Sequence, residues 1–114
     1  MKIIWGILIM SLLTSCTTSI KDYEAEKPTL VLENYLNGKM VAHGLFMDRF
    51  GKVKKRFTVH LNTTWAGPVG TLQEDFEWSD GTKTQRIWTV TKQADGKYKG
   101  TAADVDGFAV GETA

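Results

Sequence analysis

The side chains able to do acid–base or nucleophilic chemistry are few and widely separated. The sequence has two histidines, His43 and His60, and a single cysteine, Cys16. Neither histidine has an aspartate or glutamate at an obvious metal-ligand spacing, so we expect no metal site. The neighbouring carboxylates Glu74 and Asp75 would point to opposite faces of a strand and could not act as an acid–base pair. We therefore expect no catalytic residues and no cofactor, and a protein that is not an enzyme.

Composition limits the partners. The 114 residues allow one small domain after an N-terminal signal. The chain has 14 Lys and Arg against 13 Asp and Glu, and Lys2 lies in the part that a signal peptidase would remove. This neutrality argues against nucleic acid, which requires a basic surplus. The basic run of Lys52, Lys54, Lys55 and Arg56 favours a solvated strand face over a contact with phospholipid headgroups.

Elements with a period of two must position any site. Apolar and polar residues alternate in five runs, at residues 39–48, 53–61, 70–78, 83–92 and 97–105. Glycine-containing turn signals separate them, which predicts a mainly β fold with an antiparallel meander. Before these runs, Leu32, Tyr35 and Leu36 share one helical face, which predicts one or two turns of helix.

The alternation predicts which face is buried. In the second run, Phe57 and Val59 lie on one face, and Lys54 and Arg56 lie on the other. A two-residue loop at 50–51 and three-residue loops at 80–82 and 94–96 extend the apolar face across the sheet. Its other members are Met40, Ala42, Gly44, Phe46, Val53, Leu61, Leu72, Glu74, Phe76, Trp78, Arg86, Trp88, Val90, Tyr98, Gly100, Ala102 and Asp104.

Three charged residues share this otherwise apolar face. The predicted register places Arg86 between Phe76 and Asp104 and diagonal to Glu74. Because a buried charge is costly unless it is paired, the three should bond one another. They could form a structural lock or a charge cluster at a barrel mouth, or they could form the polar end of a ligand pocket. A wrong register would leave them exposed.

The N-terminus is typical of a secretory signal peptide over residues 1–15. Lys2 precedes an apolar run over residues 3–13, too short to span a bilayer as a helix. The run Leu13-Thr14-Ser15-Cys16 resembles the lipobox of bacterial lipoproteins. In that family the cysteine sulfur carries a diacylglycerol, the signal is cleaved before the cysteine, and the new amine is acylated, with palmitate for example. The alternative is an ordinary signal peptide with an incidental cysteine.

The resemblance implies an address and a domain order. Residues 1–15 would be the signal peptide, with a signal helix, and residues 16–29 the lipidated Cys16 with a polar tether. Residues 30–114 would form the β-barrel-like domain. By similarity to the sorting rule of enteric bacteria, Thr17 after Cys16 predicts an outer-membrane protein that faces the periplasm.

Ordered sequence blocks carry a second resemblance. They include Asp48-Arg49-Phe50-Gly51-Lys52-Val53, Gly70-Thr71-Leu72-Gln73-Glu74-Asp75-Phe76, Arg86-Ile87-Trp88 and Tyr98-Lys99-Gly100-Thr101-Ala102-Ala103-Asp104-Val105. Together they resemble the proteobacterial lipoproteins of domain-of-unknown-function family 3833. The resemblance implies part of a lipocalin-like (calycin-type) barrel and no established activity. Family members continue past Ala114, so we expect a chain that is incomplete at its C-terminus.

Two functions follow as hypotheses. In the first, a lipid-anchored envelope lipoprotein holds a small apolar or amphipathic ligand of fatty acyl type inside the barrel. Phe57, Glu74, Phe76, Arg86, Trp88 and Tyr98 would line that site. In the second, the barrel is packed solid and the lipoprotein is structural, with a partner docking on the outer face around His43, Arg56 and His60.

Overall fold

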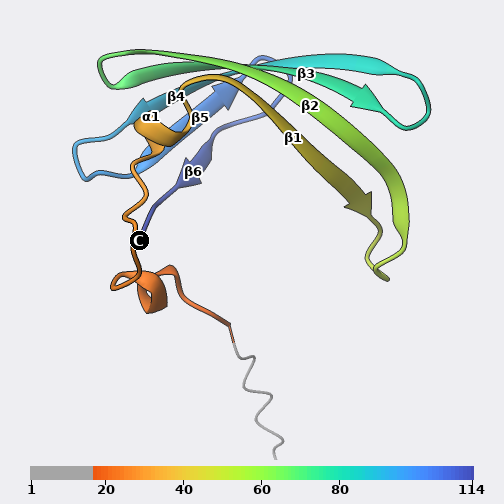
Figure 1. Cartoon of the computed structure of the whole chain (residues 1–114). Helices are drawn as coiled ribbons and strands as arrows, with labels where there is room; N and C mark the ends of the chain where they lie inside the picture. The colour runs from red at the N-terminus through yellow and green to blue at the C-terminus, as the bar shows by residue number, and fades with distance from the viewer. Residues whose placement is uncertain (1–16) are drawn as a thin grey trace, which may run out of the picture.

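The computed structural model describes residues 17–114, most of which form one curled antiparallel sheet (Figure 1). Six strands follow one another in chain order as a meander. They are β1 (Gly38–Met47), β2 (Val53–Ala66), β3 (Val69–Trp78), β4 (Lys83–Lys92), β5 (Tyr98–Ala102) and β6 (Ala109–Gly111). The sheet arches into a half-barrel, so the predicted mainly β meander is confirmed. The predicted signal helix and Cys16 lie outside the described residues.

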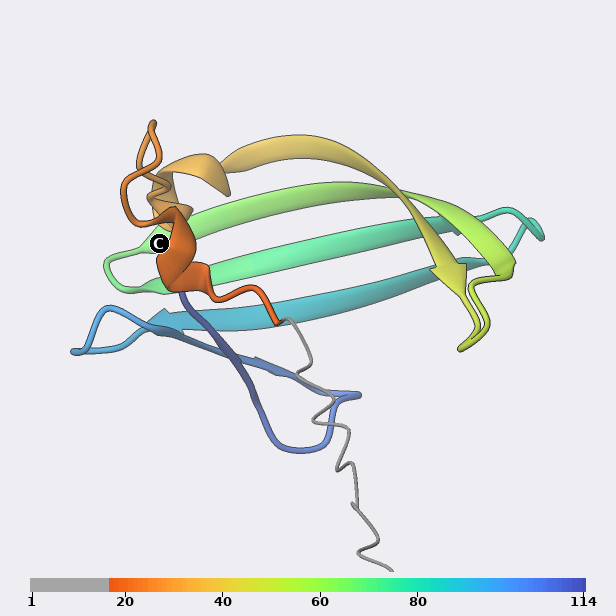
Figure 2. The same ribbon diagram turned by 90° about the horizontal axis from the view of Figure 1, so that it is seen from below.

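Two short helices precede the sheet. The 3₁₀ helix η1 (Ile20–Tyr23) lies in the predicted tether, and the single turn α1 (Leu32–Tyr35) confirms the predicted helix before the first strand. Figure 2 shows both helices at one end of the concave side. The indole N–H of Trp65 donates to the carbonyl of Leu36 at 2.7 Å, which fixes α1 to β2. Within residues 17–114, no helix is long and apolar enough to cross a membrane.

The second strand is longer than predicted. It continues through residues 62–66, which the sequence pattern had placed in a turn. Thr63 and Trp65 keep the alternation of the inner face there, and Thr63 is the most buried side chain of the described chain. A two-residue turn at Gly67-Pro68 is sufficient to join β2 and β3, because Gly67 takes a positive φ of 57°.

The β3–β4 turn corrects a predicted loop. The pattern placed the loop at residues 80–82, whereas the structure has it at residues 79–81. The backbone N–H of Trp78 donates to the carbonyl of Thr82 at 2.9 Å and closes it there. Gly81 then takes the third loop position at φ 85°, where such loops need a left-handed residue. The pairing of β3 with β4 moves by two residues, so every side chain keeps its face.

The β1–β2 turn also differs from the prediction. Its loop has three residues, 49–51, rather than the two predicted at 50–51, because the N–H of Asp48 donates to the carbonyl of Lys52. A register shift between Phe46 and Met47 then restores the predicted pairing along the rest of β1.

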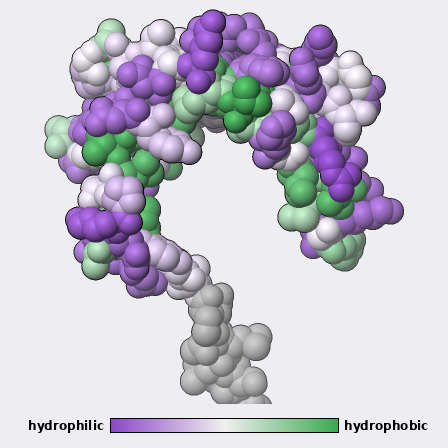
Figure 3. Space-filling view, viewed as in Figure 1, coloured by the Kyte–Doolittle hydropathy of each residue, from purple (hydrophilic) through white to green (hydrophobic). Residues whose placement is uncertain are grey.

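The predicted inner face is confirmed as the concave face of the arch. Figure 3 shows apolar side chains lining the inside of the arch and polar side chains over the outside. Val59, Leu72 and Tyr98 are the buried apolar residues of the described chain, whereas Lys54 and Arg56 are exposed. The core is therefore thin, and much of the concave face is only partly covered.

A glycine on β1 provides a test of this packing. Gly44 lies opposite Phe57, whose ring covers it, and a Cβ built at Gly44 would lie 2.3 Å from Cζ of that ring. We expect Gly44→Ala to lower the free energy of unfolding by about 1–3 kcal/mol, because the ring must move. Urea denaturation measures it. Gly111→Ala is the control, since nothing lies within 4 Å of its Cβ position. Equal losses in the two variants would contradict the expected clash.

Candidate ligand-binding site on the concave face

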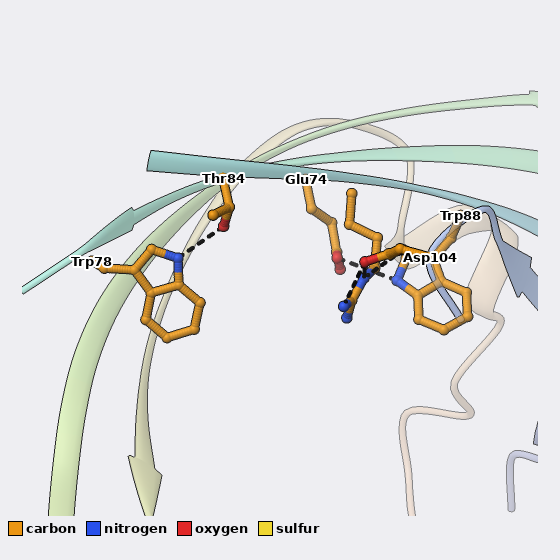
Figure 4. Close-up of polar contacts among 6 residues, drawn as sticks. Glu74, Trp78, Thr84, Trp88 and Asp104 are labelled. Carbon is orange, nitrogen blue, oxygen red and sulfur yellow. Dashed lines mark hydrogen bonds and ion pairs between the residues drawn. The ribbon is translucent and has the colours of Figure 1, made fainter. Parts of the chain in front are cut away.

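An aromatic hollow occupies one half of the concave face. Its volume is about 480 Å³. Three aromatic rings form walls of this hollow: Phe57 packs edge-on against Phe76 at 5.4 Å between centroids, and Trp78 stacks on Phe76 at 5.6 Å. The indole N–H of Trp78 donates to Oγ1 of Thr84 at 2.8 Å, which fixes the plane of this ring (Figure 4). The remaining lining residues are Phe46, Gln85, Arg86 and Asp104.

A charged pair forms one edge of this hollow. The Nε and Nη2 atoms of Arg86 donate to the carboxylate of Asp104, with the shortest distance at 2.9 Å. This contact confirms the predicted approach of the two residues. The pair is only partly buried, because its side chains are 39% and 57% exposed. Within residues 17–114, no hydrogen bond uses Nη1 of Arg86, so a ligand anion could bind there.

Glu74 does not complete the predicted trio. The structure pairs Glu74 directly with Arg86 across β3 and β4, where the prediction had them diagonal. Its carboxylate instead accepts the indole N–H of Trp88 at 3.2 Å (Figure 4). Burial raises the pKa of Glu74, and the Trp88 hydrogen bond and the charge of Arg86 only partly offset this. Glu74 is thus a half-buried carboxyl on an apolar surface.

A second, smaller hollow lies toward the α1 end of the same face. It has a volume of about 270 Å³. Glu74 and Trp88 border it on the side of the aromatic hollow, and Tyr98 lies at its other side. Its other lining residues are Leu32, Leu72, Val90, Gly100, Ala109, Val110 and Gly111. The two hollows form a strip along the concave face, with polar groups near its middle.

Glu33 of α1 fixes the helix over this second hollow. Its carboxylate accepts hydrogen bonds from Oη of Tyr98 at 2.6 Å and from Nζ of Lys92 at 2.5 Å. These hydrogen bonds lower the pKa of Glu33 to about 2, and the bond from Lys92 has the larger effect, ahead of the bond from Tyr98. Residues distant in sequence thereby join α1 to β4 and β5.

The Glu33 contacts predict a pH dependence. Because the folded-state pKa lies below the ordinary 4.5, ionised Glu33 stabilises the folded state. This stabilisation is complete above about pH 4.5 and is lost as the pH falls toward 2. We expect Glu33→Gln to have lower stability at neutral pH and a smaller loss between pH 5 and 2, measured by urea denaturation at each pH. Glu77→Gln is the control. A Glu33→Gln curve parallel to that of the wild type would contradict this.

All six predicted ligand-binding residues belong to the concave face. Phe57, Phe76 and Arg86 line the aromatic hollow. The other three, Glu74, Trp88 and Tyr98, line the smaller one. The structure therefore distributes the predicted single pocket over two adjacent hollows, and a ligand-binding role for these residues stays a prediction.

Several side chains at the concave face contribute to these contacts without having been predicted as site residues. Trp78 and Phe46 lie on the predicted inner face but were not among the predicted site residues. Thr84 lies two residues before Arg86 on β4 and therefore shares its face, a pattern from which Thr84 could have been predicted. Glu33 carries no local signal at all, since its partners are more than fifty residues away in sequence.

The convex face carries the two histidines. Nδ1 of His43 lies 3.2 Å from Oγ1 of Thr58, and His60 pairs across the sheet with Asp75. This His60–Asp75 proximity was not foreseen. Hydrogen bonds from Gln85 and Gln73 lower the pKa of Asp75. Among residues 17–114, no three His, Cys, Asp or Glu side chains are grouped to hold a metal ion.

Comparisons with known proteins identify the family to which the chain belongs. No curated protein and no solved structure matches the chain. A family model described as protein of unknown function, DUF3833, matches residues 10–114. This match spans nearly the whole chain, including every element of the half-barrel described above. The chain therefore belongs to the DUF3833 family.

Proposed function

We propose that this chain is a non-enzymatic, lipid-anchored envelope protein whose half-barrel holds a small apolar or amphipathic ligand of fatty acyl type. The observation that carries the proposal is the aromatic hollow of about 480 Å³ with Arg86 at its edge. Small-molecule sites are typically about 300–1,000 Å³, mostly apolar, with a few polar groups that orient the ligand. The hollow has this size, and its lining combines four aromatic side chains with the polar side chains of Thr84, Gln85, Arg86 and Asp104.

The chemistry of the strip favours an acyl chain with a polar head. Phe57, Phe76 and Trp78 offer ring surfaces to methylene groups. Nη1 of Arg86, which bonds no other group of residues 17–114, offers a charge-assisted hydrogen bond to a carboxylate. A curled antiparallel meander also fits the lipocalin-like architecture that holds ligands of this class, an argument by analogy.

A direct binding assay tests the ligand. Purified full chain would be titrated into a dansyl-labelled fatty acid, with fluorescence enhancement as the readout. We expect saturable binding that palmitate displaces more strongly than hexadecanol does, because only the acid can pair with Arg86. No enhancement, together with no lipid in an organic extract of the purified protein, would overturn the proposal.

The lipid anchor and the outer-membrane location are proposed from the sequence of residues 13–17. Mass spectrometry of the protein purified from a Gram-negative host should find a tri-acylated Cys16 as the first residue. Cys16→Ser should lose both the lipid and the membrane fraction. Thr17→Asp should retain the lipid but move the protein to the inner membrane. An unmodified Cys16 in the wild type would refute the anchor.

The convex face supports a second candidate, an envelope interaction protein. A hollow of about 430 Å³ there includes His43, Arg56 and Glu77, polar groups that a protein partner could contact. Chemical cross-linking in intact cells followed by mass spectrometry would test it. Cross-links centred on Arg56 that Arg56→Glu abolishes, with no ligand in the concave face, would favour this candidate.

A further inference from the structure

The tip of the β1–β2 hairpin combines an exposed aromatic ring with a concentration of positive charge. Phe50, at the apex, is 82% exposed, the highest value among the large apolar side chains of the described residues. Phe46 and Met47 beside it are 60% and 52% exposed. Such exposure costs free energy in water, so an apex that presents these side chains points to a contact surface.

The chain's charge is unevenly distributed, and the hairpin is its positive part. Between Phe46 and Arg56 the sequence has five cationic residues and one acidic residue, whereas the other described residues have eight cationic and twelve acidic. Within residues 17–114, Arg49, Lys52 and Arg56 form no ion pair. The guanidinium of Arg49 lies 5.0 Å from the centre of the Phe50 ring, so charge and ring are adjacent.

Hydrogen bonds across the turn support the backbone conformation that presents Phe50 at the apex. Oδ1 of Asp48 accepts the backbone N–H groups of Phe50 at 2.9 Å and Lys52 at 3.0 Å. The N–H of Gly51 donates to the carbonyl of Asp48, and Gly51 takes a φ of 80°, which closes the loop. The one acidic side chain of the tip is therefore used mainly to hold the turn.

We propose that this hairpin tip, residues 46–56, docks on an anionic phospholipid bilayer, with Phe50 in the interface and Arg49 and Lys52 at the headgroups. Phenylalanine side chains of interfacial segments bury at the boundary between headgroups and acyl chains, and Lys and Arg side chains are attracted to anionic lipids. An acidic protein surface would match the charge alone, whereas an anionic bilayer matches both the charge and the exposed apex ring.

The position of the hairpin in the arch agrees with a bilayer contact. Figure 1 shows the β1–β2 tip and the segment that begins at residue 17 extending from the same side of the arch, at opposite ends. If Cys16 carries the proposed lipid anchor, this arrangement lets one bilayer contact both ends of the arch. The concave face would then open toward the membrane, the source of the proposed acyl ligand.

A fluorescent label at the apex tests the docking independently of the anchor and of the ligand. The full chain with Cys16→Ser would carry Phe50→Cys labelled with a nitrobenzoxadiazole dye. We expect a blue-shifted, stronger emission with vesicles of phosphatidylcholine and phosphatidylglycerol, and little change with phosphatidylcholine alone. About 1 M salt, which shortens the Debye length to about 3 Å, should abolish the change.

Matched variants locate the contact. Phe108→Cys with the same label is the control, because Phe108 is also an exposed ring beside a cation, Lys99, but lies between β5 and β6. In vesicle co-sedimentation of the apex-labelled chain, Lys52→Gln should lower the anionic-lipid-dependent binding about fivefold. Lys39→Gln, at the other end of β1, should leave it unchanged.

Two results would overturn the proposed docking of the hairpin tip. An unchanged emission spectrum of the label at position 50 with anionic vesicles would refute the docking. This is the result expected if the hairpin tip binds an acidic protein surface and no bilayer. Equal shifts at positions 50 and 108 would refute it as well, since the contact would not belong to the hairpin. Failure of fatty acid binding leaves these readouts unaffected, so the two proposals can fail separately.

Discussion

Replacement of Leu72 by alanine is expected to lower the free energy of unfolding by about 2–5 kcal/mol. Leu72 is 7% exposed and is one of three buried apolar residues in the described chain. It lies between Thr63 of β2 and Trp88 of β4, at the centre of the sheet. Because a small domain has only about 5–15 kcal/mol in total, this variant should be unfolded at low urea concentrations.

Leu45→Ala is the matched control for this prediction. Leu45 is the same residue type on the convex face and is 47% exposed, so its truncation should cost less than about 1 kcal/mol. Urea denaturation followed by far-ultraviolet circular dichroism measures both variants. If Leu72→Ala and Leu45→Ala unfolded at the same urea concentration, the concave face would not be the core of this sheet.

The face of each strand could be predicted because a period of two decides it without long-range information. Apolar Val59 and charged Arg56 lie on opposite sides of the alternation in β2, and the structure buries the first and exposes the second. The 94–96 loop was also predicted in its register, since Gly96 occupies its third position at φ 83°. The sequence pattern thus determines faces where apolar residues alternate clearly.

Register was harder to predict than face, because it depends on which loop position the glycine takes. Placing Gly81 second instead of third in its loop moved Arg86 from opposite Glu74 to opposite Phe76. A shift of two residues leaves no trace in the apolar pattern. The predicted residues therefore share the predicted face, whereas the predicted pairing of Arg86 with Phe76 is wrong.

Long-range contacts explain what else the sequence could not provide. Glu33 is polar, lies on a single helical turn and gives no pattern, yet it binds Lys92 and Tyr98 from β4 and β5. The docking of α1 depends on how far the sheet curls, which no local periodicity specifies. The same holds for Phe50: its sequence position indicates a turn, and only the structure shows the ring standing out from the apex.

Trp78→Ala is expected to weaken binding of the labelled fatty acid by at least about tenfold. The indole forms one wall of the aromatic hollow, with ring contacts to Phe57 at 5.2 Å and Phe76 at 5.6 Å. If the acyl chain covers roughly 60 Å² of that wall, the loss is about 1.5 kcal/mol at about 25 cal/mol per Å². Fluorescence titration of the folded variant measures it.

Two further variants separate the loss of the wall from a loss of structure. Phe108→Ala removes an exposed ring outside both hollows and should bind as the wild type does. Trp78→Phe retains a ring but removes the hydrogen bond to Thr84, so its affinity should lie between those of the wild type and Trp78→Ala. A folded Trp78→Ala protein with unchanged affinity would exclude the aromatic hollow as the binding site. The smaller hollow, which Glu74 and Tyr98 line, would then be the place to search, because Trp78 is not among its lining residues.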